Sequence, residues 1–166
     1  MDNATRGRLH PMTSPSGESR FFQWLPEVRP EGRSLAALSG EVINDTPTPM
    51  IQRVAKAWST PLRDLSCEQV RLLTSQEMGL HWLAAPVAAF VRRYPKAEIS
   101  FYPGDLSIAA LRTFPVLFER TPQDARAIAE IDFTWIVDHW KKIDAPLAAE
   151  ISELLSKAKA LCRGHS

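Results

Sequence analysis

Histidine, cysteine and acidic residues are the side chains of this sequence that could perform catalysis or hold a metal. The four histidines are His10, His81, His139 and His165, and none of them stands in an HExxH or HxxxH pattern. A zinc hydrolase site needs two such side chains one helical turn apart, so that both reach the same ion. Asp138 precedes His139 directly, but neighbouring residues of a helix point about 100° apart and cannot form a pair on one face. These histidines therefore do not predict a catalytic or metal site.

The remaining nucleophile patterns lead to the same expectation. Cys67 and Cys162 are the two cysteines, and no CxxC motif or flanking histidine accompanies them. We therefore expect two buried thiols rather than a structural zinc or a disulfide framework. A GxSxG nucleophile elbow is also absent from the sequence. We expect that the chain is not an enzyme and that it uses no cofactor and no metal.

The stretch FYPGDLSIAAL, residues 101–111, allows three interpretations. It could cradle a phosphate, present a catalytic aspartate or start a helix. A phosphate cradle needs several glycines followed by Lys and Ser or Thr, whereas Gly104 stands alone and no Lys follows it. A catalytic Asp105 would need an identifiable titrating partner. We therefore predict that Pro103 and Gly104 form a turn and that Asp105 is the N-cap of the next helix.

The composition of the chain limits the kinds of fold and function that it can have. The chain has 166 residues, 45% hydrophobic and 23% charged, which is typical of one soluble globular domain. Its formal net charge of +1 argues against general binding to nucleic acids or acidic membranes. The N-terminus has no apolar signal region, and the apolar stretch 80–91 is too short to span a bilayer. We therefore expect a cytoplasmic protein.

The hydrophobic periodicity predicts an all-α fold, a single-domain bundle of about six helices. Residues 1–20 lack periodicity and are expected to form a flexible N-terminal tail, and residues 21–166 to form the α-helical domain. FFQWLPEVRP, residues 21–30, is expected to pack as an extended N-terminal arm. Apolar repeats predict the helices at 34–40, 48–58, 66–79, 80–93 with an interruption at Pro86, 105–111, 122–142 and 145–162. The expected N-caps include Ser34, Ser66 with Gln69 in a capping box, and Thr121.

The expected long helix over residues 122–142 carries two apolar stripes. One stripe contains Ala129, Phe133, Ile136 and Trp140, and the other contains Ile128, Ile131 and Trp135, flanked by Asp124, Asp132 and Asp138. The first stripe is expected to face the core. The second has two interpretations: a central helix packed between two layers, or an exposed docking strip in which Trp135 anchors a partner and the acids complement its basic surface.

The residues from Ser34 to about Leu111 resemble the immunity proteins of bacterial contact-dependent growth inhibition systems. The resemblance rests on SLAALSGE, then PLRDLSCEQVRLLTSQEMGLHWLAAPVAAFVRRYP, then FYPGDLSIAAL, and covers about half of the chain. Thr74 and Ser75 depart from the pattern before Gln76, and Ser107 stands where that family commonly has a second Leu. The matching positions are Pro61, Leu62, Leu65, Glu68, Arg71, Gln76, Gly79, Leu80, Leu83, Pro86, Tyr102, Gly104, Asp105 and Leu106.

The resemblance implies a protein that binds the cognate C-terminal toxin domain of a surface-delivered effector and neutralises it. It implies a toxin that is a basic nuclease, and a monomeric immunity protein in a 1:1 complex that contacts neither nucleic acid nor membrane directly. Combined with the second stripe, it leads to a predicted toxin-binding surface of Asp124, Ile131, Asp132, Trp135 and Asp138.

Two other classes of function stay open at this point. The chain could be a helical interaction or regulatory module without a toxin partner, or an enzyme of unrecognised type. The neighbouring gene would distinguish the first of these classes from an immunity protein, because an immunity gene should directly follow the gene of a large secreted effector. An enzyme would have an enclosed polar cleft lined by perturbed titratable groups.

Overall fold

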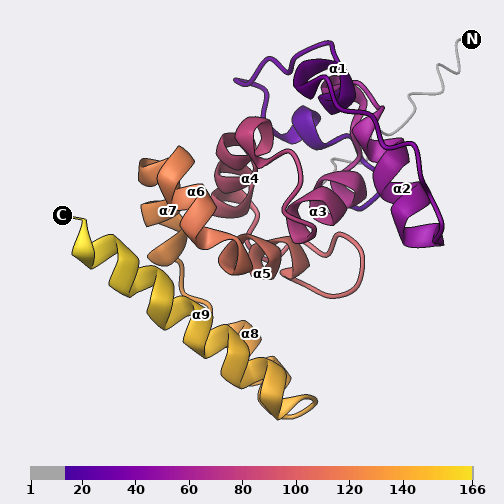
Figure 1. Ribbon diagram of the computed structural model, residues 1–166. Coiled ribbons are helices and arrows are strands. Elements are labelled where there is room, and N and C mark those ends of the chain that lie inside the picture. The colour runs from indigo at the N-terminus through magenta and orange to yellow at the C-terminus, as the bar shows by residue number, and fades with distance from the viewer. Residues whose placement is uncertain (1–13, 166) are drawn as a thin grey trace, which may run out of the picture.

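A computed structural model describes residues 14–165 of the chain, and helices dominate this part, which contains no strand. The all-α expectation is therefore confirmed for these residues (Figure 1). The helical elements are η1 (Phe21–Trp24), α1 (Leu35–Ser39), α2 (Pro49–Trp58), η2 (Leu62–Asp64), α3 (Cys67–Ser75), α4 (Leu80–Arg93), α5 (Asp105–Arg112), α6 (Phe114–Arg120), α7 (Pro122–Ala129), α8 (Thr134–Lys141) and α9 (Ala145–Gly164).

Several helices begin at a polar side chain that caps them. The hydroxyl of Ser34 accepts from the amide of Ala37 at 3.1 Å, and that of Thr48 accepts from the amide of Ile51 at 3.2 Å. Ser66 and Gln69 form the reciprocal capping box that their spacing predicts, each side chain accepting from the other residue's amide. These contacts satisfy backbone donors that the first helical turn leaves without partners.

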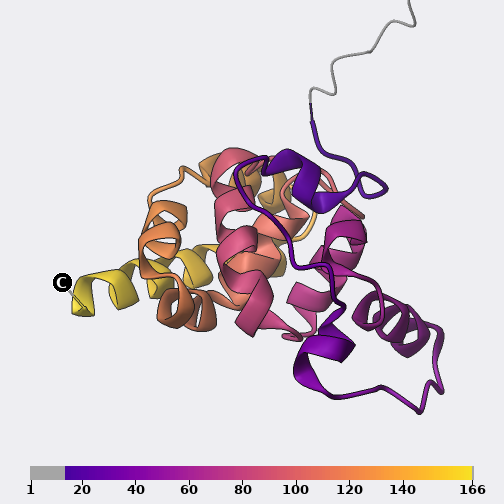
Figure 2. The same cartoon turned by 90° about the horizontal axis from the view of Figure 1, so that it is seen from above.

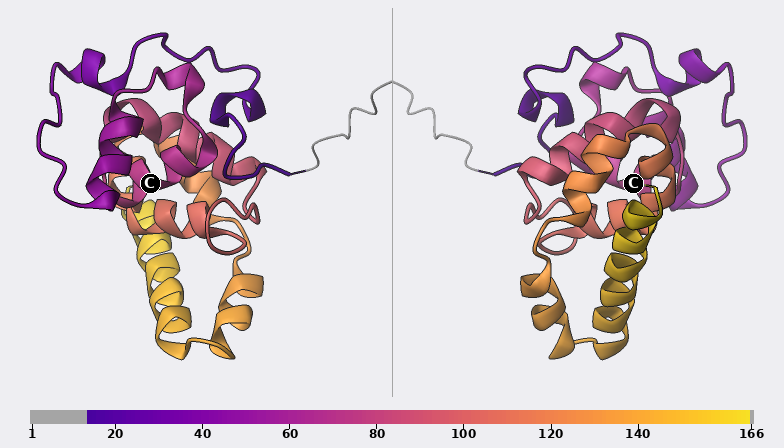
Figure 3. Two further views of the ribbon diagram at one scale, coloured as in Figure 1. Left: turned by 90° about the vertical axis from the view of Figure 1, so that its right-hand side faces the viewer. Right: turned by 90° about the vertical axis from the view of Figure 1, so that its left-hand side faces the viewer.

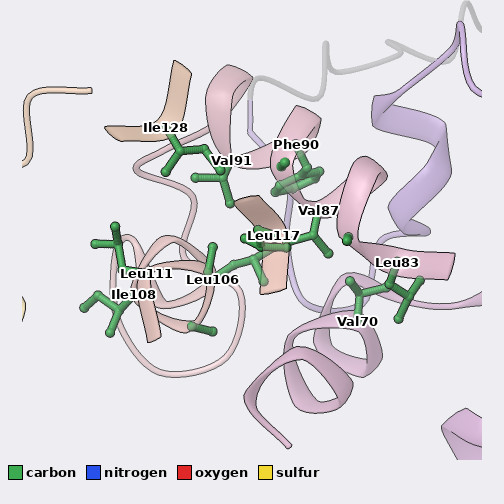
Figure 4. Packing of buried hydrophobic residues seen from close by; sticks show 14 of the residues in the cluster. Val70, Leu83, Val87, Phe90, Val91, Leu106, Ile108, Leu111, Leu117 and Ile128 are labelled. Atoms are coloured by element: carbon green, nitrogen blue, oxygen red, sulfur yellow. The ribbon is translucent and has the colours of Figure 1, made fainter. Parts of the chain in front are cut away.

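The core lies where α3, α4, α5, α6 and α7 meet. Figure 4 shows buried side chains from all five helices converging in this region. Phe90 and Leu117 are fully buried there and Ile108 is almost so, each on a different helix. Burial of these apolar side chains is the main favourable contribution to folding. Helix α9 packs along α5, α6, α7 and α8 and closes this core from the C-terminal side.

The prediction of one long helix over residues 122–142 is wrong, because the first helix of this range ends at Ala129. Helices α7 and α8 are separate, and residues 130–133 join them. The carboxylate of Asp132 accepts from the amide and from the hydroxyl of Thr134, so it satisfies donors at the start of α8. Short acidic side chains favour such local bonds over continued helix. The two stripes that assume one helix across residues 122–142 therefore do not exist as continuous lines.

Three further details differ from expectation. Helix α4 runs without interruption through Pro86, which is itself buried, although Pro86 offers no amide to the preceding turn. Thr121 does not cap α7; its hydroxyl donates to the carboxylate of Asp124 at 3.0 Å. The part of the chain that is described forms nine α-helices rather than about six, since the predicted helix 122–142 is divided and α6 was not expected.

Residues 14–20, the described part of the expected tail, contact the helical body. Residues 1–13 lie outside the described residues, but the amide of Cys67 donates to Ser19 O at 2.9 Å and that of Glu68 to Gly17 O at 3.0 Å. The expected arm is wrong over Phe21–Trp24, which form the 3-10 helix η1, whereas residues 25–30 contain no helix. Phe21 and Leu25 are fully buried. Figure 2 shows this indigo segment lying across the helical body.

Helices α8 and α9 form a hairpin that extends from the body (Figure 3). The loop between α4 and α5 touches this hairpin: a side chain at Gly104 would meet Trp135 and Ile136, and Tyr102 packs edge to face with Trp140 at 5.1 Å. Among the described helices, none combines the length and apolarity required to cross a lipid bilayer.

Candidate protein-binding surface

The five residues of the predicted toxin-binding surface fall into three places. Asp124 lies on α7, where it pairs with Arg92 of α4 at 3.4 Å and is only partly exposed. Asp124 thus links two helices of the body. Ile131 and Asp132 belong to the α7–α8 connection, and Trp135 and Asp138 to α8. The structure brings Ile131, Asp132 and Asp138 together and separates Asp124 from them.

Ile131, Asp132 and Asp138 share a hollow of about 300 Å³ between α8 and α9, which we call the α8–α9 hollow. Its apolar side chains are Ile131, Phe133, Val137 and Leu155, of which Phe133 is almost fully buried. Its rim carries polar and charged side chains: Asp132, Thr134, Asp138, Lys141, Ser152, Ser156 and Lys159. An apolar centre with a polar rim is the usual composition of a protein interface.

The rim of the α8–α9 hollow is of mixed charge rather than purely acidic. Lys141 lies 3.7 Å from Asp138 on the same helix, and both side chains are well exposed. Lys159 and Lys141 therefore balance the two carboxylates of the rim. The hydroxyl of Thr134, followed by its amide, lowers the pKa of Asp132 by donating to the carboxylate. Asp132 consequently remains a fixed negative charge down to acidic pH.

Trp135 is not part of this hollow. Its ring lies against Gly104, where an added Cβ would come within 2.8 Å of it, and the ammonium of Lys96 stands 5.3 Å from the ring centre. Trp135 is half-buried and packs on the core. The indole therefore helps to join α8 to the loop before α5, which is a structural contact.

Asp105 is not the N-cap that the sequence predicts, because Gly104 occupies that position with φ +82° and Asp105 is the first helical residue. Its carboxylate is almost fully buried and accepts from four backbone amides: Ile99 at 3.1 Å, Ser100 at 2.7 Å, Phe101 at 3.0 Å and Leu106 at 2.9 Å. Asp105 therefore fixes the loop that precedes α5 as well as the first turn of the helix.

This loop presents Phe101 to solvent, and the sequence-based reasoning missed that residue. The ring is 66% exposed and lies 4.7 Å from the guanidinium carbon of Arg71, which is only 9% exposed. The Nε of Arg71 donates to the hydroxyl of Ser100 at 2.7 Å. One signal could have drawn attention to Arg71: it is the charged residue among the apolar Val70, Leu72 and Leu73 of α3.

A second hollow, of about 520 Å³, lies between the N-terminal segment, α2, η2 and α3. Arg53 and Lys56 line one side, and Glu18, Asp64 and Glu68 line the other. These groups are spread over an open, charged surface. Within residues 14–165, no group of three or more His, Cys, Asp and Glu side chains could hold a metal ion.

The cysteines and histidines serve local packing where they can be described. Burial raises the pKa of the Cys67 thiol from 9.0 to about 11, whereas Cys162 is only partly buried. His139 and His81 each pack edge to face with the following tryptophan, and His165 packs in the same way on Phe118. His10 lies outside the described residues.

Comparison of this chain with models of protein families, with curated proteins and with solved structures finds no match.

Proposed function

We propose that this chain is an immunity protein that binds and neutralises the cognate C-terminal toxin domain of a contact-dependent growth inhibition effector. The toxin is a basic nuclease in this proposal, and the chain acts by stoichiometric 1:1 binding in the cytoplasm without catalysis of its own. The resemblance of residues 34–111 to that family of immunity proteins motivates the choice of partner.

The α8–α9 hollow is the observation that carries a protein-binding role. It joins apolar side chains, among them Ile131 and Leu155, to a charged rim on a helical hairpin that extends from the body (Figure 3). In this proposal Asp132 and Asp138 meet basic side chains of the toxin, while Lys141 repels partners with the wrong charge pattern. We retain Ile131, Asp132 and Asp138 as contact residues. Trp135 stays a proposed contact on α8 outside the hollow. Asp124 is less suited because it is held by Arg92.

The motif residues of the resemblance support the proposal in a second way. Leu65, Leu83 and Leu106 are buried or nearly so, and Gly79 and Gly104 adopt positive φ values of +70° and +82°. These are residues that a fold requires, so the motif describes a scaffold. A scaffold of this kind can carry different partner surfaces, as an immunity family directed against different toxins needs.

Co-expression with the toxin domain encoded next to this chain tests the proposal. We expect restored growth and a 1:1 complex that survives purification. A catalytically inactive variant of the toxin domain is the control for binding, because it is not toxic but keeps the surface that the chain would bind. If the chain neither restores growth nor co-purifies with either form, the proposal is wrong.

A further inference from the structure

Within residues 14–165, no carboxylate forms an ion pair with the buried guanidinium of Arg71. Arg71 is nine-tenths buried on α3, and charged side chains are rarely buried to this extent unless they are paired. Within the described residues, the guanidinium of Arg71 forms one hydrogen bond, from Nε to the Ser100 hydroxyl. Burial lowers the pKa of Arg71, and attraction to Asp105 and Glu68 offsets this in part.

Asp105 cannot serve as the missing partner, since its carboxylate is occupied by four backbone amides. The two Nη atoms of Arg71 therefore have no acceptor within residues 14–165. Neither is sealed from solvent, because the one enclosed polar side-chain atom without a partner in this part of the chain is Nε1 of Trp140. Each Nη atom thus keeps some contact with solvent, while the Phe101 ring lies over the guanidinium.

Phe101 adds an apolar group to this open cation. Its ring is 66% exposed, and its backbone amide is fixed by Asp105. The loop therefore needs little further ordering when a partner binds, which removes one of the costs of association. Aromatic and arginine side chains together dominate the binding energy of protein interfaces. A guanidinium also binds carboxylates in a two-pronged geometry that ammonium groups cannot reproduce.

We propose that Arg71 and Phe101 form an anchor site that takes a carboxylate of the partner protein together with an adjacent apolar side chain. This inference rests on the proposed function, because the partner is the same toxin domain. The anchor lies on the loop that touches α8 through Gly104 and Tyr102, next to the hairpin that carries the α8–α9 hollow. A protein with a basic surface still carries individual carboxylates that can enter this site.

Binding of the purified, catalytically inactive toxin domain to the full chain tests the anchor. Phe101→Ala and Arg71→Gln should each raise the Kd roughly 30-fold or more, as loss of an interface hot spot does. Val42→Ala and Arg29→Gln are the matched controls: Val42 is 67% exposed on the α1–α2 connection, and Arg29 is exposed before α1. The control variants should change the Kd less than about 3-fold, since isolated exposed residues contribute little to binding.

The outcomes separate the two proposals. If the wild-type chain does not bind, both proposals fall. If it binds and folded Phe101→Ala and Arg71→Gln bind as tightly as wild type, the anchor is overturned and the proposed function stands. Phe101→Ala keeps the test valid should Arg71→Gln fail to fold, because the Phe101 ring is largely outside the core.

The identity of the occupant needs a second measurement. Each Asp and Glu of the toxin domain is changed in turn to Asn or Gln. One of these changes should raise the Kd about as much as Arg71→Gln does. Combined with Arg71→Gln, the same change should raise the Kd little further. The absence of any such carboxylate overturns the proposed occupant. Binding of single-stranded RNA that depends on Arg71 would also overturn it, since a phosphate would then occupy the site.

Discussion

At the residue scale, the carboxylate of Asp105 holds both the loop before α5 and the first turn of that helix. This buried carboxylate accepts from four backbone amides, three of them in the preceding loop. Asp105→Ala leaves these amides without an acceptor in a region that water reaches poorly. We expect a loss of about 3 kcal/mol of unfolding free energy, because charged hydrogen bonds and their unsatisfied donors each contribute on the order of 1–3 kcal/mol. Urea denaturation measures this loss.

Two comparison variants make the measurement specific. Asp105→Asn keeps the shape and one acceptor oxygen, so we expect it to lie between wild type and Asp105→Ala. Asp45→Ala removes an exposed carboxylate from the α1–α2 connection and should be nearly neutral. A loss below about 1 kcal/mol for Asp105→Ala would mean that its role is that of an ordinary exposed cap.

Because the Cys67 thiol is buried, we expect the free energy of unfolding to depend on pH in the alkaline range. Burial raises the pKa of this thiol from 9.0 to about 11, so the folded state favours the protonated form. This contribution is fully present below pH 9, the ordinary pKa of the thiol, and is lost as the pH rises through 11. The unfolding free energy should therefore fall between pH 9 and 11, and more steeply in the wild type than in Cys67→Ala. Equal slopes for the two proteins would contradict this assignment.

At the scale of elements, two glycines with similar backbones separate conformational strain from close packing. Gly104 has φ +82°, and an added Cβ would come within 2.8 Å of Trp135 and 2.9 Å of Ile136 on α8. Gly40 has φ +74° and nothing within 4 Å of that position. Gly40→Ala should cost about 1 kcal/mol through the left-handed backbone alone. Gly104→Ala should cost about 3 kcal/mol, because overpacking against α8 is added.

Chemical denaturation of both variants gives the comparison. Their difference reports how tightly the start of α5 packs on α8, because the backbone strain is common to both. Equal losses for the two variants would show that α8 yields to the added methyl group. The hairpin of α8 and α9 would then be more loosely joined to the body than the distances indicate.

Local signals predicted those elements whose limits depend on residues close in sequence. Ser34 and Ser66 cap their helices as expected, because a cap involves residues three positions apart. The break at Asp132 was missed, since apolar repeats on both sides of it mimic one helix. The site at Arg71 could not be found from spacing: Ser100 and Phe101 reach it from about thirty residues further along the chain, and only the packing of the loop on α3 brings them together.

At the scale of the whole molecule, the proposed binding surface consists of two features, one on the C-terminal hairpin and one at the loop that touches it. The α8–α9 hollow combines side chains of two helices, and the anchor of Arg71 and Phe101 combines α3 with the loop before α5. The contacts of Gly104 with Trp135 and of Tyr102 with Trp140 hold these parts in a fixed relation. A single docking strip on one helix is therefore replaced by a surface assembled from four elements.

The charges on the rim of the α8–α9 hollow predict how fast a basic toxin associates. Changing both Asp132 and Asp138 to Asn removes two exposed carboxylates, whereas Asp45→Asn removes one at a distance from the hairpin. The double variant should associate roughly 10-fold more slowly at low salt, with a smaller change in dissociation, because rim charges act mainly on the encounter step. The difference should shrink as NaCl approaches about 1 M, where the screening length falls to about 3 Å. Stopped-flow association kinetics across this salt range measures both effects, and a double variant that associates as fast as Asp45→Asn at low salt would remove Asp132 and Asp138 from the encounter surface.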